Sequence, residues 1–289
     1  MIVAAGLTPA WQQILVFQQL RLGHVNRAQQ AVWCGSGKVL NVGAALKQLG
    51  AESLTISPIG GATGQQIRDD FARRGIPARW VSTIATTRIC TTILDQATGA
   101  TTELIENSAP LTDAELARYA DAFAESTRSA SDVVFSGSLP QGAPPSFYRS
   151  LMERVSARII LDIRGRELIE CLPLSPLLVK PNRDELAATV GRSLDTEGDV
   201  IAAMSEVRDL GAAWVVVSHG PAPLLVLGAS GLHRIEPPPV KALNPIGCGD
   251  SLTAAIAAQL ARGATPLDAI TFGVTYAAQK AAQLLPVSK

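Results

Sequence analysis

Hydrophobic residues change their spacing along the chain in a way that separates the first third from the rest. From Leu111 onward, short apolar runs alternate with segments whose apolar residues recur at helical spacing. Near-continuous apolar runs such as residues 214–217 are typical of strands in a parallel sheet that is covered on both faces. The pattern predicts strands at 132–136, 158–162, 177–180 and 213–218, and helices at 112–126, 145–155, 183–190, 196–209, 250–261 and 266–284.

The first third mixes buried strands with strands that have a polar face. Its pattern predicts strands at 2–5, 14–20, 25–33 and 54–59, helices at 39–49 and 64–74, and a hairpin with arms at 87–95 and 101–106. The half-polar strands and the hairpin, rich in Thr and Ile, favour a small separate sheet. We therefore expect one α/β domain over residues 1–289, with a doubly wound, mainly parallel sheet and a small β-sheet from approximately 11–33 and 87–107.

Composition and charge narrow the range of partners. Lys+Arg and Asp+Glu both total 25, so no global positive field exists to hold nucleic acid or an anionic membrane. The 4 cysteines are far apart and predict neither a disulfide framework nor a zinc site. The first residues lack the basic segment of a signal peptide, and no apolar run approaches the ~18 residues of a membrane span. We expect a soluble, cytoplasmic protein.

Glycine-rich and polar segments fall where predicted strands end and helices begin, which is where α/β sheets bind ligands. The sharpest is Gly247-Cys248-Gly249-Asp250, directly before a predicted helix. Its amides and the helix N-terminus suit the developing charge of a transferring phosphoryl group. Asp250 is placed to take a proton from an attacking hydroxyl. Because Asp is also favoured as a helix cap, the motif alone leaves both interpretations open.

Two further segments offer polar groups at helix starts. Asn182 and Glu185 are three residues apart, and an amide with a carboxylate suits a Mg²⁺ ion that keeps several waters. The same pair fits a capping box. Residues 35–41 offer free amides together with Lys38 and Asn41, although they form neither a Walker A loop nor a dinucleotide fingerprint.

Two arginines are candidates for holding a phosphate. Arg88 lies in the predicted hairpin, and Arg27 lies in the predicted strand before the first glycine-rich loop. A guanidinium binds phosphate through paired hydrogen bonds, but solvated surface arginines are common, and the sequence leaves both roles open.

Taken in order, these segments resemble the PfkB, or ribokinase-like, family of carbohydrate kinases. The similarity is strongest to its 1-phosphofructokinase, 6-phosphofructokinase-2 and tagatose-6-phosphate kinase branch, and it covers nearly the whole chain. The motifs that carry it are Leu7-Thr8-Pro9-Ala10, Val25-Asn26-Arg27, Gly37-Lys38 with Asn41-Val42, Gly60-Gly61-Ala62-Thr63-Gly64, Thr87-Arg88-Ile89, Ser136-Gly137-Ser138-Leu139-Pro140, Lys180-Pro181-Asn182 with Glu185-Leu186, and Gly247-Cys248-Gly249-Asp250-Ser251.

The resemblance implies an ATP-dependent kinase whose small β-sheet is a lid and often a dimer interface. It implies that the amides of Gly247, Cys248 and Gly249 form an anion hole and that Asp250 is the base. It also implies that Asn182 and Glu185 organise Mg²⁺, through water. The positions that it assigns to the nucleotide are Lys180, Asn182, Ser218 and Gly220, and those that it assigns to the sugar are Gln12, Arg27, Gly37, Lys38, Asn41, Arg88 and Ser138.

The chain departs from this branch mainly around the sugar. Gln12 stands where the branch has an Asp that contacts sugar hydroxyls, Thr8 replaces an Asn, and Cys90 stands where Asn is frequent. The usual Gly-Gly-Lys-Gly is Ser36-Gly37-Lys38-Val39, and Pro223 removes an amide donor from the nucleotide loop. The transfer residues are intact, so a changed sugar is favoured over lost catalysis.

Three functions follow in order of preference. The first is a kinase acting on a ketohexose phosphate, with fructose 6-phosphate, fructose 1-phosphate and tagatose 6-phosphate as candidates. The second is a kinase of the same fold for an unphosphorylated sugar or nucleoside, for which Gln12 leaves room. The third is a catalytically weak, sugar-binding regulatory homologue, and intact Gly247–Asp250 speaks against it.

Overall fold

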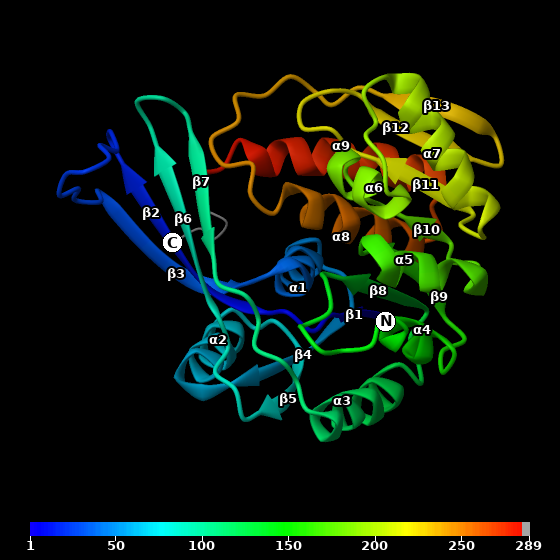
Figure 1. The fold of residues 1–289 in the computed structure, drawn as a ribbon, viewed down its shortest axis with the longest axis horizontal. Coiled ribbons are helices and arrows are strands. Elements are labelled where there is room, and N and C mark those ends of the chain that lie inside the picture. Colours follow the sequence, from blue (N-terminus) through cyan, green and yellow to red (C-terminus); the bar gives the residue numbers. More distant parts are fainter. Residues whose placement is uncertain (285–289) are drawn as a thin grey trace.

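The computed structural model describes residues 1–284 and shows a large and a small β-sheet (Figure 1). The large sheet has nine strands in the order β13-β12-β11-β10-β9-β8-β1-β4-β5. Every pair from β11 to β5 is parallel, and β12 and β13 continue the sheet antiparallel. These strands are β1 (Ile2–Ala5), β4 (Ser53–Gly60), β5 (Ala78–Thr83), β8 (Asp132–Ser136), β9 (Arg158–Asp162), β10 (Leu178–Val179), β11 (Trp214–Val217), β12 (Leu224–Gly228) and β13 (Gly231–Ile235).

Helices cover both faces of the large sheet (Figure 1). One layer holds α1 (Lys38–Gln48), α2 (Gly61–Arg73), α8 (Cys248–Ala261) and α9 (Pro266–Ala281). The other holds α3 (Asp113–Ser126), α4 (Phe147–Met152), α5 (Gly165–Cys171), α6 (Arg183–Val190) and α7 (Glu197–Asp209), with a short 3-10 turn at Leu172–Leu174. The doubly wound, mainly parallel fold that the sequence predicts is confirmed.

Strand β1 shows why the large sheet needs both layers. Its four residues are all buried, and alternate side chains point to opposite faces. Val3 packs in the core that contains α3 to α7, whereas Ile2 packs in the core that contains α1, α2, α8 and α9. A strand that is apolar on both faces is stable only between two apolar layers.

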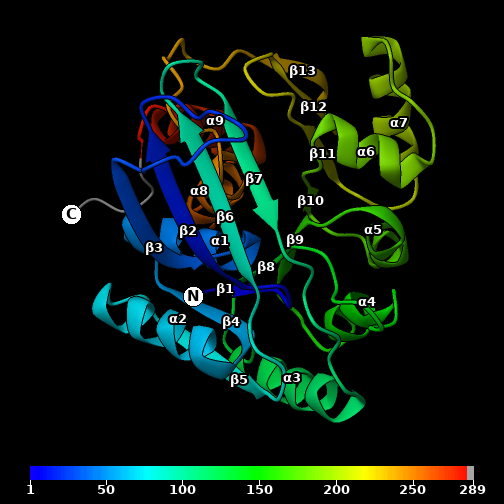
Figure 2. The ribbon, with the colours of Figure 1, turned by 60° about the vertical axis from the view of Figure 1, so that its left-hand side comes forward.

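The small sheet has the strand order β3-β2-β6-β7 and lies beside the large one (Figure 2). Its strands are β2 (Ala10–Phe17), β3 (Gln30–Ser36), β6 (Ile89–Asp95) and β7 (Thr101–Ile105). Strand β2 pairs antiparallel with β3 and parallel with β6, and β6 and β7 form the expected hairpin. The division of the chain into a single domain with a lid stays a prediction.

Most predicted elements are present, with differences at their ends. The strands at 132–136 and 158–162 and the helix at 183–190 match residue for residue. The predicted strand at 25–33 begins only at Gln30, so Arg27 lies in an exposed loop between β2 and β3 instead of in a strand. Elements without a predicted counterpart are β5, β12, β13, α5 and the 3-10 turn at Leu172–Leu174.

Within residues 1–284, we find no helix that is both long and apolar enough to cross a membrane.

Candidate functional site

Asp250 lies in the first turn of α8, at the carboxyl edge of the large sheet. Gly247 caps this helix with φ +76°, a left-handed conformation that favours glycine. The first turn of any helix leaves backbone N–H groups without helical partners, and here they lie beside Asp250. The Asp250 carboxylate is only 6% exposed and accepts a hydrogen bond from Asn41 Nδ2 at 2.7 Å.

The surroundings of Asp250 shift its affinity for protons. Burial and the nearby Asp162 carboxylate raise the pKa of Asp250 to about 6, while the charge of Lys38 and the Asn41 hydrogen bond oppose this rise. A buried carboxylate with such a pKa is ionised at neutral pH and can accept a proton from a bound hydroxyl. The neighbouring Cys248 thiol has its pKa raised to about 11 by burial and by Asp250, so it stays protonated.

A network of two lysines and two carboxylates, buried except for the partly exposed Lys38, adjoins Asp250. Lys38 Nζ lies 3.0 Å from Asp162 Oδ1 and 2.7 Å from Glu185 Oε1, and Lys180 Nζ lies 3.5 Å from Asp162 Oδ2. Burial would lower the pKa of Lys38, but the surrounding carboxylates outweigh it and raise that pKa. Burial would raise the pKa of Asp162, but the charges of the two lysines outweigh burial and lower that pKa. The network therefore holds two ammonium groups close enough to Asp250 to lower its pKa by their charge.

Sequence reasoning missed Asp162, which links the two lysines. It is 1% exposed at the end of β9, and its Oδ2 also accepts a hydrogen bond from Thr253 Oγ1 at 3.0 Å. Thr253 stands one turn after Gly249, whose carbonyl it also binds at 3.0 Å. The signal available in the sequence is a single Asp at the end of a predicted apolar strand.

Asn182 and Glu185 form the capping box of α6. The Asn182 side chain accepts from the Glu185 amide at 2.8 Å, and Glu185 Oε2 accepts from the Asn182 amide at 3.0 Å. Glu185 Oε1 is bound by Lys38, so both carboxylate oxygens already have partners. Because both carboxylate oxygens of Glu185 already have partners, this pair suits contact with a metal through water better than direct ligation. Among residues 1–284, no cluster of three or more His, Cys, Asp or Glu side chains is arranged to hold a metal.

The junction between β3 and α1 brings Lys38 and Asn41 to the network. Gly37 has φ +89°, and a Cβ there would lie 2.8 Å from the Thr8 carbonyl oxygen. Ser36 Oγ donates to Asn41 Oδ1 at 3.1 Å, which directs the amide nitrogen of Asn41 toward Asp250. The glycine and the two polar neighbours therefore fix the side chain that contacts the Asp250 carboxylate.

Arg88 is held by the backbone. Its guanidinium donates to the carbonyls of Thr8 at 3.0 Å, Pro9 at 3.3 Å and Glu106 at 3.1 Å. Three of its five N–H donors are thus used to tie the start of β6 to neighbouring segments. Ser138 is exposed, and its carbonyl accepts from Thr8 Oγ1 at 3.2 Å.

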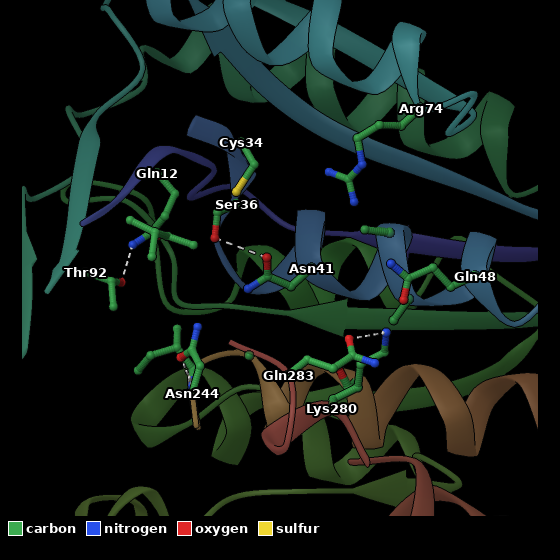
Figure 3. Close-up of a pocket in the computed structure, with 17 residues that line it drawn as sticks. Gln12, Cys34, Ser36, Asn41, Gln48, Arg74, Thr92, Asn244, Lys280 and Gln283 are labelled. Carbon is green, nitrogen blue, oxygen red and sulfur yellow. Dashed lines mark hydrogen bonds between the residues drawn. The ribbon is translucent and has the colours of Figure 1, made fainter. Parts of the chain in front are cut away.

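Gln12 lines a cavity that the small sheet shares with α1 and with the loop before α8 (Figure 3). Its Nε2 donates to Thr92 Oγ1 at 2.5 Å, and its side chain is buried. Asn41 and Gly247 line the same cavity, so it adjoins the surroundings of Asp250. Three of the residues proposed from sequence therefore meet here, whereas no contact joins Arg27 to them in the described part of the chain.

The predicted nucleotide positions lie at neighbouring strand ends. Asn182 forms a parallel bridge with Ser218, and the Arg183 amide donates to the Ser218 carbonyl at 3.0 Å. Gly220 is exposed with φ +55° in the following turn. Pro223 lines a cavity of about 150 Å³ in front of β12. Lys180 belongs to the buried network, so these positions extend from that network to the surface.

The fold and the site define an α/β protein with a buried carboxylate at the glycine-capped start of a helix. This carboxylate lies next to the network of Lys38, Lys180 and their two acidic partners. Residues 11–286 match the pfkB family carbohydrate kinases, and the chain belongs to this family. It is accordingly an ATP-dependent carbohydrate kinase.

Solved structures of phosphofructokinases have the same fold. Phosphofructokinase-2 from Escherichia coli, in its tetrameric inhibited form, is 30% identical with a TM-score of 0.89, over 97% of this chain and 93% of that one. Its complex with fructose-6-phosphate is 30% identical with a TM-score of 0.87, over 97% and 94%. A possible 1-phosphofructokinase from Thermotoga maritima is 21% identical with a TM-score of 0.92, over 100% and 94%, and shows the fold alone. The family resemblance stated from the motifs is confirmed.

Proposed function

We propose that this kinase transfers the terminal phosphoryl group of ATP to a hydroxyl of a ketohexose phosphate. The observation that carries this is Asp250, a buried carboxylate with a pKa of about 6 at the N-terminus of α8. Fructose 6-phosphate, fructose 1-phosphate and tagatose 6-phosphate are the candidate acceptors. The complex of the 30% identical Escherichia coli enzyme with fructose-6-phosphate supports the first of them.

In this proposal Asp250 removes the proton from the attacking hydroxyl. The amides of Gly247, Cys248 and Gly249 stabilise the charge of the transferring group. A Cβ at Gly249 would lie 3.5 Å from Lys180 Nζ, so a side chain there would narrow the space between loop and lysine. This close approach supports a role for both in holding phosphate oxygens.

The remaining residues are proposed to bind the two substrates. Bound ATP supplies the phosphoryl group, and Mg²⁺ held through water by Asn182 and Glu185 would neutralise its phosphates. The proposed nucleotide contacts are Lys180, Asn182, Ser218 and Gly220. The proposed sugar contacts are Gln12, Arg27, Gly37, Lys38, Asn41, Arg88 and Ser138.

A kinase of an unphosphorylated sugar or nucleoside is the second candidate. Arg88 spends three donors on backbone carbonyls, which leaves fewer for a phosphate, and Arg27 is exposed in a loop. Arg88→Ala distinguishes the two. We expect it to raise the KM for a phosphorylated sugar more than the KM for ATP, and equal effects would remove Arg88 from the sugar site.

The small sheet is proposed to act as a lid and as the interface of a homodimer. Trp33 and Leu104 are 40% and 56% exposed. Trp33 pairs with Gln13, Gln13 with Thr91, and Thr91 with Leu104, so the four side chains form one row on one face. A row that carries two exposed apolar side chains on a small sheet suits burial against a second copy.

The decisive measurement is ADP release from MgATP with a panel of hexoses, hexose phosphates and nucleosides. We expect turnover with one ketohexose phosphate and a roughly 10²–10⁴-fold lower kcat for Asp250→Asn. Asp268→Asn is the matched control, because Asp268 is also in the first turn of a helix but is exposed. Turnover of Asp250→Asn within a few-fold of the parent would refute the assignment. No turnover with any acceptor, despite ATP binding, would favour the weak regulatory homologue.

A further inference from the structure

The cavity that Gln12 lines has a second, cationic end. It has a volume of about 70 Å³ and lies between the small sheet, α1, the end of α9 and the loop before α8. Asn41 and Gly247 line one part, and Arg74, Gln48 and Lys280 line another. In Figure 3 the Arg74 guanidinium is directed into this space from α2, and Lys280 and Gln283 approach it from the opposite side.

The lining has an unusual balance of charge. Among the described residues that line the cavity, two are cationic, five are neutral amides and none is Asp or Glu. The amides are Gln12, Asn41, Gln48, Asn244 and Gln283. Cations with neutral donors and no carboxylate form an environment that favours an anion and disfavours a metal ion.

Arg74 is partly neutralised but retains free donors. Its Nη1 lies 3.2 Å from Asp70 Oδ2, and its side chain is 18% exposed. Asp70 also binds Arg73 at 3.4 Å and the Gly35 amide at 3.0 Å, and it does not line the cavity. A guanidinium carries five N–H groups in a fixed fork, so Arg74 can bind Asp70 on one side and an oxyanion on the other.

Lys280 is half-buried at the cavity without a carboxylate partner among residues 1–284. Its Nζ lies 3.3 Å from Gln283 Oε1 and 5.5 Å from the centre of the Tyr276 ring. Burial lowers the pKa of Lys280, and the interaction with Cys248 opposes this lowering. An anion in the cavity would favour the charged form of Lys280 by Coulomb attraction and so oppose this lowering.

We propose that this cavity binds a compact oxyanion, either free inorganic phosphate or the phosphate group of the acceptor, between Arg74 and Lys280. The volume suits a group of this size and is too small for a nucleotide. Asn41 connects the site to the catalytic centre, since it lines the cavity and hydrogen-bonds the Asp250 carboxylate. Only the question of which source supplies the anion rests on the proposed function; binding itself does not.

The first test is thermal unfolding of the full chain with inorganic phosphate, against potassium chloride of equal ionic strength. A ligand that binds the folded state raises the Tm with its concentration. We expect phosphate to raise the parent's Tm, and Lys280→Met and Arg74→Gln to bind phosphate about tenfold or more weakly.

Matched controls separate the cavity from general charge effects. Lys47→Met removes an exposed lysine of α1, and Arg73→Gln removes the other arginine bound to Asp70; neither residue lines the cavity. Both should keep the parent's response to phosphate. No shift in the parent, or equal shifts in Lys280→Met and Lys47→Met, would overturn the proposal. If Arg74→Gln unfolds because Asp70 loses a partner, the comparison of Lys280→Met with Lys47→Met still tests the proposal.

Kinetics then identify the source of the anion. If the acceptor carries it, inorganic phosphate competes with the acceptor, and Lys280→Met raises the KM for the acceptor while leaving that for ATP unchanged. If the anion is free, phosphate changes kcat without competing with the acceptor. A parent without any turnover would refute the proposed function but could still show the phosphate-dependent Tm shift. Failure of the proposed function and failure of the anion site are therefore distinguishable.

Discussion

Burial and the Asp162 carboxylate raise the pKa of Asp250 to about 6, and a base must be ionised to accept a proton. We therefore expect kcat/KM to fall in inverse proportion to proton concentration below about pH 6 and to be flat above it. The measurement is kcat/KM from acidic to neutral pH at saturating MgATP. An apparent pKa close to the ordinary Asp value of about 4 in this profile would contradict the buried environment.

The same rise in pKa means that ionised Asp250 destabilises the folded state. A carboxyl group with a raised folded pKa favours folding at low pH, and this contribution is lost as pH rises through the folded pKa of about 6. At neutral pH, Asp250→Asn should therefore raise the free energy of unfolding by about 1–3 kcal/mol while lowering kcat. Urea unfolding at pH 5 and pH 8 tests this, because the gain should be larger at pH 8. A variant less stable than the parent at pH 8 would contradict it.

Asp162 should matter for both stability and activity. Its removal leaves Lys180 buried without its 3.5 Å partner, and an uncompensated buried charge costs about 3–5 kcal/mol. Asp162→Asn should therefore lower the free energy of unfolding and the kcat. Asp132→Asn is the control: Asp132 is also buried, and its carboxylate binds Arg158 at 2.8 Å at the opposite end of β8. It should lose stability but keep its kcat, and equal kcat losses in both variants would exclude a role for Asp162 in the site.

At the scale of elements, sequence patterns predicted what local periodicity determines. Strands such as β8 and long helices such as α8 carry continuous or periodic apolar residues. Strand β13 is half-exposed at a sheet edge, and α5 has only seven residues, so neither builds a recognisable period. Their conformation follows from neighbours: β13 forms by pairing with β12, and α5 packs on α4 and α6.

The candidate site divides in the same way. The capping box of Asn182 and Glu185 and the glycine cap of α8 are local and were visible in the sequence. Asp162 was not, because its partners Lys38 and Thr253 lie 124 and 91 residues away. The cationic end of the cavity likewise joins α2 and α9, which no spacing connects.

The β3–α1 junction should be sensitive to a single methyl group. Gly37→Ala places a Cβ 2.8 Å from the Thr8 carbonyl oxygen at φ +89°, so strain and clash add. Gly50→Ala is the control, with φ +66° and nothing within 4 Å, so it carries strain alone. We expect Gly50→Ala to cost about 1 kcal/mol and Gly37→Ala clearly more, measured by urea unfolding. Equal losses would show that the Thr8 segment yields.

At the scale of the molecule, the two faces of the small sheet have different surroundings. One face carries Gln12 and Thr92 into the cavity, next to the residues around Asp250. The row with Trp33 and Leu104 lies on the other face. Trp33 alternates with the cavity-lining Cys34, and Leu104 pairs with Thr91, which alternates with the cavity-lining Thr92. A partner covering that row would hold the sheet from outside while substrate contacts it from inside, so assembly and catalysis should be linked.

Leu104→Glu tests this link, because a carboxylate that becomes buried in an interface must be desolvated without a partner. We expect the parent to sediment as a dimer and Leu104→Glu as a monomer at equal protein concentration, with a higher KM for the sugar and an unchanged KM for ATP. Ile84→Glu is the control: Ile84 is 89% exposed and lies after β5, outside the small sheet. A monomeric parent, or a dimer that survives Leu104→Glu as it survives Ile84→Glu, would place any interface elsewhere. A monomeric Leu104→Glu with the parent's KM values would instead separate assembly from the sugar site, and contacts within the subunit, such as those with α1 and α2, would then hold the sheet in position.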